Sequence, residues 1–221
     1  FSVPESYNAS AVLFDNLSAG RGTNIALHSG DLRLSYAALC ALSCQAGNAL
    51  VRTGLARSDR VVMLLDDTPV YPAAFFGAVR AGFVPVLVNT LSPAELVQYY
   101  IEDSSAEIVI AESNLLPVLS EALENGADIR LVVVANGEQP EAFPVATVSW
   151  DDFVSQELPE LAAADTHRDD MAFWMYSSGS TGRPKGIVHL QHDMPYTHLS
   201  YAEHVLKLTE NDIVYSVPKI F

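Results

Sequence analysis

The segment at residues 176–186, YSSGSTGRPKG, concentrates hydroxyl groups, glycines and one lysine. Its hydroxyl donors are Ser177, Ser178, Ser180 and Thr181, its glycines are Gly179, Gly182 and Gly186, and its ammonium group belongs to Lys185. Glycines let backbone N–H groups turn toward an anion, hydroxyls donate hydrogen bonds, and an ammonium adds positive charge. A polyphosphate needs these groups, so we predict that the segment binds the phosphates of a nucleotide.

The segment differs from a Walker A loop, in which lysine is preceded by glycine and followed by serine or threonine. Here Pro184 precedes the lysine and Gly186 follows it. Apolar residues at 171–177 and 186–189 predict two strands that the segment joins, with the anion beyond the carboxyl end of the first. A surface turn is the alternative. Chance would produce the seven fixed residues of GSTGxPKG about once per hundred million positions, which disfavours that alternative.

Histidines follow the segment closely, with His189 and His192 three residues apart and Asp193 and His198 nearby. A metal site at these residues is disfavoured because a change from strand to helix separates the first two. No further carboxylate or thiolate completes a ligand set. Arg183 is expected to be solvated rather than bound to a ligand.

Two other pairs of reactive side chains are also interpreted without a metal. Asp66 and Asp67 end a predicted strand and are better explained as carboxylates at a helix start than as a magnesium pair. Cys40 and Cys44 lie one turn apart on a predicted helix, a spacing that makes a poor disulfide, and we expect both to be buried. The sequence therefore predicts no metal site.

The elements that position the segment follow from alternating helical and strand patterns along the chain. Strands are predicted at residues 24–28, 32–34, 60–65, 84–88, 107–111 and 131–135. Helices are predicted at residues 36–54, 68–82 and 114–125, with others starting at Asn8 or Ser10 and at the capping box of Ser92 and Glu95. This order predicts an α/β fold, a mainly parallel sheet with helices on both faces.

The alternation lapses between residues 136 and 168, where prolines and acidic residues predict a surface excursion with one short helix at 150–156. A subdomain seam is a candidate there. Residues 213–221 have a strand-like pattern with no terminating signal.

Charge and hydropathy limit the classes of partner. The formal charge is -15, from 27 acidic and 12 basic residues, which argues against a nucleic acid or an anionic membrane as partner. No apolar stretch approaches the about 20 residues that span a bilayer, and residues 1–5 do not resemble a secretory signal. We therefore expect a cytoplasmic protein. The oligomeric state is not indicated.

Residues 176–186 resemble the phosphate-binding signature of the adenylate-forming superfamily, which includes acyl- and aryl-CoA synthetases, luciferases and the adenylation domains of peptide synthetases. Four further stretches resemble successive blocks of that superfamily's N-terminal domain, in the same order: LSYAAL (34–39), DRV (59–61), AVRAGFVPV (78–86) and DSSAE (103–107). The YSS start, GIVH at 186–189 and SVPKIF at 216–221 look most like benzoate-CoA ligases. Where the superfamily commonly has threonine, this chain has Ser177, which keeps the hydroxyl donor.

The resemblance implies that residues 1–221 are an N-terminal AMP-binding domain fragment of an ATP-dependent carboxylate-CoA ligase, without the C-terminal portion. It implies ATP, Mg²⁺ and coenzyme A as ligands and an aromatic acid such as benzoate as substrate. In such enzymes the acid attacks the α-phosphate to give an acyl-adenylate and pyrophosphate, and the CoA thiol then displaces AMP. The adenine, ribose and acid-binding motifs lie outside the chain, so the fragment alone is expected to be inactive.

The resemblance also implies roles for individual residues. Lys185 and the segment's hydroxyls would neutralise charge on the β- and γ-phosphates as pyrophosphate leaves. His192 falls where such synthetases often carry a histidine, so it is a candidate for the acyl pocket, with an ordinary helix-cap histidine as the alternative. Two other functions stay open: an adenylating enzyme that loads a carrier-protein thiol, and a non-catalytic nucleotide-binding module.

Overall fold

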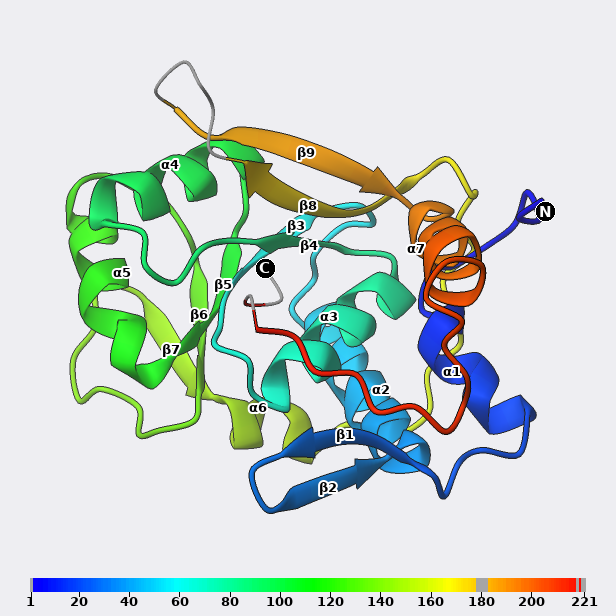
Figure 1. The fold of residues 1–221 in the computed structure, drawn as a ribbon. Coiled ribbons are helices and arrows are strands. Elements are labelled where there is room, and N and C mark those ends of the chain that lie inside the picture. The colour runs from blue at the N-terminus through cyan, green and yellow to red at the C-terminus, as the bar shows by residue number, and fades with distance from the viewer. Residues whose placement is uncertain (1, 178–182, 218, 220–221) are drawn as a thin grey trace.

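A computed structural model of the chain describes residues 2–177, 183–217 and 219 (Figure 1). Its helices are α1 (Ala11–Ser18), α2 (Tyr36–Arg52), α3 (Val70–Ala81), α4 (Ala94–Ser104), α5 (Leu116–Glu124), α6 (Trp150–Ser155) and α7 (Asp193–Thr197), with a 3₁₀ turn at Ser113–Leu115 and a π-helix at His198–Glu203. Its strands are β1 (Ile25–Ser29), β2 (Leu32–Ser35), β3 (Arg60–Leu64), β4 (Val84–Leu87), β5 (Ile108–Glu112), β6 (Leu131–Ala135), β7 (Ala146–Ser149), β8 (Met171–Ser177) and β9 (Lys185–Leu190).

The main sheet has seven strands in the order β7-β6-β5-β3-β4-β8-β9, and a separate hairpin joins β1 and β2. Strands β3 to β8 pair in parallel, and β9 alone runs antiparallel to its neighbour, β8. Because parallel strands end on the same side, β3, β4, β5, β6 and β8 share one carboxyl end of the sheet. The predicted α/β fold with a mainly parallel sheet is confirmed.

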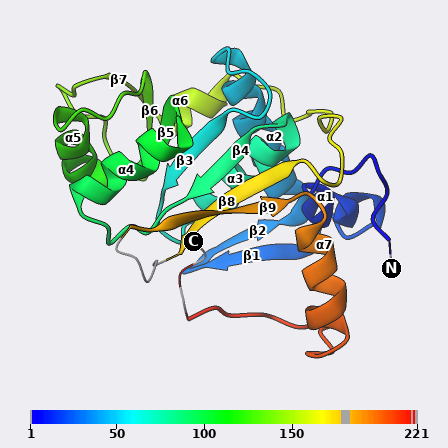
Figure 2. The ribbon, with the colours of Figure 1, turned by 90° about the horizontal axis from the view of Figure 1, so that it is seen from above.

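Helices cover both faces of this sheet (Figure 2). On β3, Val61 and Met63 join the core formed with α1, α2, α3 and α6, whereas Val62 and Leu64 join the core formed with α4 and α5. Alternate residues of a strand point to opposite faces, so this one apolar run supplies both cores. A buried parallel strand of this kind explains why β3 shows no alternation of polar and apolar residues.

Two helix starts differ in their capping. The Ser35 hydroxyl accepts a hydrogen bond from the Ala38 N–H at 3.2 Å, so the predicted cap of α2 is confirmed. The predicted capping box at Ser92 is wrong, because extended Pro93 occupies the N-cap position and Ser92 lies one residue too early. The buried Ser92 hydroxyl instead lies 3.3 Å from the hydroxyl of Tyr100.

The predicted excursion at residues 136–168 contains a strand that the sequence interpretation missed. β7 pairs in parallel with β6, and Trp150 and Phe153 of the following helix α6 belong to the same core as α2. The sheet therefore extends into this region as far as Ser149, and the subdomain seam stays a prediction. Among the described residues, no helix has the length and apolar content needed to cross a membrane.

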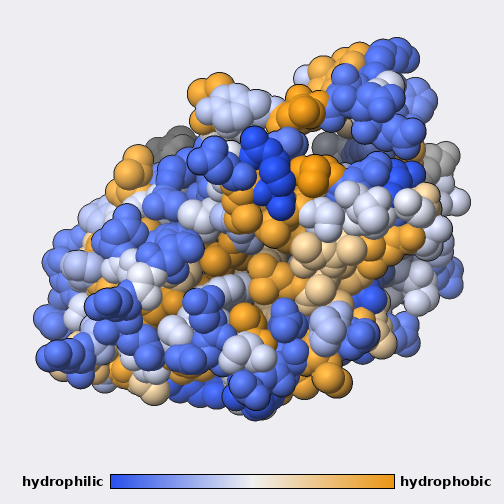
Figure 3. Space-filling model, turned by 90° about the horizontal axis from the view of Figure 1, so that it is seen from below, coloured by the Kyte–Doolittle hydropathy of each residue, from blue (hydrophilic) through white to orange (hydrophobic). Residues whose placement is uncertain are grey.

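The predicted strand at 213–221 is wrong for the described residues of that range, which form no regular structure. A strand needs a neighbour for its backbone hydrogen bonds, and no described strand pairs with this stretch. Its apolar side chains Ile213, Val214, Tyr215 and Val217 are exposed. Further apolar surface gathers across the middle of the face seen in Figure 3. The stretch returns to the sheet at Lys219, whose ammonium pairs with the Asp66 carboxylate.

Candidate phosphate-binding site

The glycine-rich segment connects β8 to β9 at the carboxyl end of the sheet. Ser177, the last residue of β8, pairs with Lys185, the first residue of β9, and Tyr176 pairs with Gly186. The prediction that the segment joins two strands is confirmed. Ser178, Gly179, Ser180, Thr181 and Gly182 lie outside the described residues, so the structure places only the two ends of the predicted site.

Lys185 is exposed at the start of β9, and Ser177 is partly buried opposite it. The exposed ammonium is free to meet a ligand that approaches the carboxyl end of the sheet, where open α/β sheets bind their ligands. Arg183 is also exposed, and its guanidinium carbon lies 5.4 Å from the centre of the Tyr99 ring. The contact of Lys185 with phosphate stays a prediction, as does the expectation that Arg183 binds no ligand.

A polar network lies at the same end of the sheet, after β5 and β6. The Glu112 carboxylate is buried and accepts hydrogen bonds from the Thr68 hydroxyl at 3.2 Å and the Asn136 amide at 2.9 Å. Asn136 also donates to the Thr68 hydroxyl at 3.0 Å. These bonds tie the end of β5 to the turns that follow β3 and β6. No sequence motif marks the network, because its members lie up to 68 residues apart.

The sequence predicts that Asp66 is a carboxylate at the start of a helix, but in the structure its side chain bonds to residues outside α3. It accepts a hydrogen bond from the Thr90 hydroxyl at 3.4 Å and pairs with Lys219. The N-cap of α3 is Pro69, which makes no side-chain cap bond. Across the described part of the chain, no group of three or more His, Cys, Asp or Glu side chains is arranged to hold a metal ion.

Helix α4 contacts both ends of the glycine-rich segment. The Tyr176 hydroxyl donates to the Asp103 carboxylate at 2.7 Å, and the Tyr99 hydroxyl donates to the carbonyl of Pro184 at 3.1 Å. Burial raises the pKa of Tyr176 above its usual range, and the hydrogen bond to Asp103 raises it further. Sequence reasoning assigned no role to Tyr99 or Asp103; the only signal was the position of Asp103 in the DSSAE block.

The candidate acyl-pocket residue, His192, lies at the opposite end of β9 from Lys185. The six residues of β9 span about 17 Å, and His192 follows them. Its Nδ1 lies 2.9 Å from the carbonyl oxygen of Arg168, and its Nε2 lies 3.3 Å from the Asp193 carboxylate. The structure thus does not bring His192 and Lys185 together, and the role of His192 stays a prediction.

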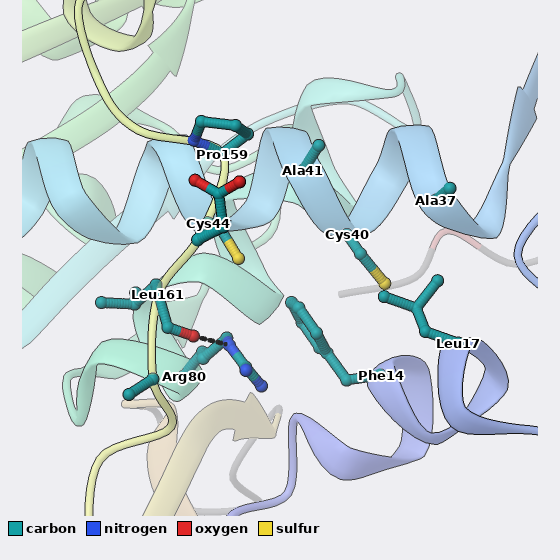
Figure 4. Close-up of a pocket in the computed structure, with 11 residues that line it drawn as sticks. Phe14, Leu17, Ala37, Cys40, Ala41, Cys44, Arg80, Pro159 and Leu161 are labelled. Atoms are coloured by element: carbon teal, nitrogen blue, oxygen red, sulfur yellow. Dashed lines mark hydrogen bonds between the residues drawn. The ribbon is translucent and has the colours of Figure 1, made fainter.

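A cavity of about 440 Å³ lies between α1, α2 and residues 159–162, on the α2–α3 face of the sheet (Figure 4). Cys40 and Cys44 line it beside Phe14 and Arg80, whose guanidinium donates to the carbonyl of Leu161 at 2.6 Å. Burial raises the pKa of Cys40 to about 11, so its thiol stays protonated near neutral pH. Both cysteines are buried and free, as predicted.

Comparison with known proteins places the chain in a family. The AMP-binding enzyme family model matches residues 14–221. The 4-hydroxybenzoate-CoA/benzoate-CoA ligase of Rhodopseudomonas palustris is 37% identical over 97% of this chain and 39% of its own length. The benzoate-CoA ligase of Thauera aromatica is 34% identical over 99% of this chain and 41% of its own length. The chain thus spans about two fifths of these relatives.

Solved structures of CoA ligases resemble the fold of this chain. The anthranilate CoA ligase AuaEII in complex with anthranoyl-AMP superposes with a TM-score of 0.90 and 31% identity, covering 95% of this chain and 40% of that one. A benzoate CoA ligase from Burkholderia xenovorans LB400 superposes with a TM-score of 0.83 and 32% identity, covering 96% of this chain and 40% of that one. The chain therefore belongs to the AMP-binding enzyme family of adenylate-forming proteins.

Proposed function

We propose that this chain supplies the phosphate-binding part of an ATP-dependent carboxylate-CoA ligase that activates an aromatic acid such as benzoate. The observation that carries the proposal is the glycine-rich segment between β8 and β9, with Lys185 exposed at the carboxyl end of the sheet. The two relatives compared above are ligases of benzoate and 4-hydroxybenzoate, which supports the choice of acid. AuaEII was solved in complex with anthranoyl-AMP, an acyl-adenylate, which supports the intermediate.

The proposed reaction has two steps. The acid's carboxylate attacks the α-phosphate of ATP, forming the acyl-adenylate and releasing pyrophosphate. The thiol of coenzyme A then attacks the acyl carbon and releases AMP. Negative charge accumulates on the leaving pyrophosphate in the first step, so a lysine and hydroxyl donors near it lower the barrier by electrostatic stabilisation.

In this proposal, Lys185 contributes the positive charge and Ser177, Ser178, Ser180 and Thr181 contribute hydroxyl donors, while Gly179, Gly182 and Gly186 leave the backbone accessible. Mg²⁺ is usually held by substrate phosphates and only one or two carboxylates. This mode fits the described part of the chain, in which no set of three metal-binding side chains occurs. The ion would arrive with ATP and neutralise phosphate charge.

The proposal is tested by product analysis with the full-length gene product that carries this chain. The protein is incubated with MgATP, coenzyme A and a panel of benzoate, hydroxybenzoates, anthranilate and aliphatic acids. We expect AMP and an aryl-CoA thioester, with benzoate or a hydroxybenzoate giving the highest kcat/KM. AMP formation without a CoA thioester would favour a carrier-protein acceptor, and ATP binding without AMP formation would favour a non-catalytic module.

A further inference from the structure

We propose that Tyr99, Asp103 and Tyr176, together called the α4 clamp, are positioning residues that hold Lys185 at the phosphate-binding site. This inference rests on the proposed function. None of the three side chains needs to touch a substrate. They act on Lys185 through the backbone on either side of it.

The two hydrogen bonds of the α4 clamp reach the two sides of the glycine-rich segment. Tyr176 immediately precedes Ser177 at the end of β8, and its hydroxyl donates to Asp103 on α4 at 2.7 Å. Pro184 immediately precedes Lys185, and its carbonyl accepts a hydrogen bond from Tyr99 on α4 at 3.1 Å. Since Tyr99 and Asp103 are one helical turn apart, a single rigid helix holds both sides.

Gly186, on the other side of Lys185, lies against the same group of side chains. A Cβ atom on Gly186 would lie 3.5 Å from the Tyr176 ring and 3.7 Å from the Asp103 carboxylate, which is ordinary van der Waals distance. Lys185 is thus flanked by Pro184, which is hydrogen-bonded to the α4 clamp, and by Gly186, which pairs with Tyr176 across the two strands. The position of the Lys185 backbone is set from both sides, although its own side chain is exposed.

The chemistry of the α4 clamp makes it a stiff support. A phenol that donates to a carboxylate forms a charge-assisted hydrogen bond, stronger than a neutral one. The Tyr176 ring also packs on Tyr100, with ring centres 4.5 Å apart, and makes an edge contact with Tyr99 at 6.1 Å. Helix packing alone needs only the rings, whereas the Tyr99 hydroxyl is directed to the carbonyl of Pro184 and the Tyr176 hydroxyl to Asp103 on α4. Removing a hydroxyl while keeping the ring therefore separates positioning from packing.

Limited proteolysis of the full-length gene product tests the α4 clamp without using activity. Trypsin cleaves after Lys185, while the bond after Arg183 is protected by Pro184. In the Tyr99→Phe/Tyr176→Phe double variant we expect cleavage after Lys185 to be about tenfold faster, because a charge-assisted hydrogen bond and a second bond no longer restrain the backbone. Asp103→Asn should give a smaller increase, since an amide oxygen still accepts.

Tyr100→Phe is the matched control. Tyr100 lies on the same helix and packs on the same ring, but its hydroxyl is directed to Ser92, away from the segment. This variant should be cleaved at the wild-type rate. The thermal unfolding midpoint is measured for every variant, so that faster cleavage is assigned to the segment only where the midpoint is unchanged.

The two half-reactions give the second measurement. In the double variant, acid-dependent ATP–pyrophosphate exchange should fall about 10- to 100-fold because the lysine is misplaced, mainly in kcat. Conversion of supplied benzoyl-AMP and coenzyme A to the thioester should be unchanged, because that substrate has no β- or γ-phosphate.

Three outcomes of the cleavage and half-reaction measurements separate the α4 clamp from the proposed function. Wild-type rates of both cleavage and exchange in the double variant would overturn the α4 clamp. Equal losses in both half-reactions would also overturn it, because they would indicate general damage to the enzyme. If the wild-type protein activates no acid, the proposed function fails instead, and the trypsin rates alone decide whether the α4 clamp restrains Lys185.

Discussion

Lys185 has an exposed side chain, but its backbone pairs with Ser177 of β8, and the preceding residue, Pro184, is hydrogen-bonded to α4. An exposed side chain on a fixed backbone suits a group that must meet charge only as that charge develops. Electrostatic stabilisation of this kind depends on placement rather than on proton transfer. Loss of the ammonium should therefore slow the step in which pyrophosphate leaves.

Lys185→Ala should slow adenylation in the full-length gene product. The transition state should lose about 2 to 4 kcal/mol of stabilisation, because the developing pyrophosphate charge loses its counter-charge. The rate of ATP–pyrophosphate exchange measures this loss. Lys207→Ala removes an exposed cation outside the site and serves as the control. An unchanged exchange rate in Lys185→Ala would remove the assigned role of the glycine-rich segment.

At the scale of elements, helices α2 and α3 approach each other through glycines. A Cβ atom on Gly77 would lie 2.5 Å from the carbonyl oxygen of Ser43, and one on Gly47 would lie 2.7 Å from that of Gly77. Neither helix can accept a methyl group there without moving apart. This pair of helices packs on the face of the sheet opposite α4.

Gly77→Ala should therefore lower the free energy of unfolding by about 1 to 3 kcal/mol, the usual cost of overpacking. Urea unfolding measures the change. Gly22→Ala is the matched control, since its added methyl would meet Leu17 and Ala37 at ordinary distances of 3.5 and 3.8 Å. If both variants unfold at the wild-type urea concentration, the close approach of α2 and α3 is not a constraint on stability.

The elements differ in how well the sequence predicts them. β3 and α2 were predicted because long apolar runs and the Ser35 cap are local signals. β7 was missed because its four residues follow a proline-rich stretch and its pairing with β6 is not local. The α4 clamp was missed for the same reason, as Asp103 and Tyr176 lie 73 residues apart in the sequence. The segment itself was recognised from residue types alone.

At the scale of the whole molecule, burial of tyrosines makes stability depend on alkaline pH. Burial raises the pKa of Tyr176 and of Tyr71, and the charges of Asp103 and Asp67 raise the two values further. In the unfolded chain both hydroxyls ionise near pH 10, as ordinary tyrosines do. Above about pH 10 the folded state therefore binds more protons than the unfolded state, and stability falls as pH rises.

Each of these tyrosines should lower the free energy of unfolding by about 1.4 kcal/mol per pH unit above its unfolded-state pKa. Urea unfolding between about pH 8 and about pH 11 measures the slope. Tyr176→Phe should show a shallower decline than the wild-type protein, whatever its stability at neutral pH. Identical slopes would mean that Tyr176 ionises alike in the folded and unfolded states.

ATP–pyrophosphate exchange tests whether this chain carries the phosphate site of an aromatic-acid-activating ligase. The exchange is measured with the full-length gene product, with and without benzoate and hydroxybenzoates and in the absence of coenzyme A. We predict exchange that requires the aromatic acid and is saturable in it. Exchange that is absent with every acid, or that proceeds equally without any acid, would contradict the claim.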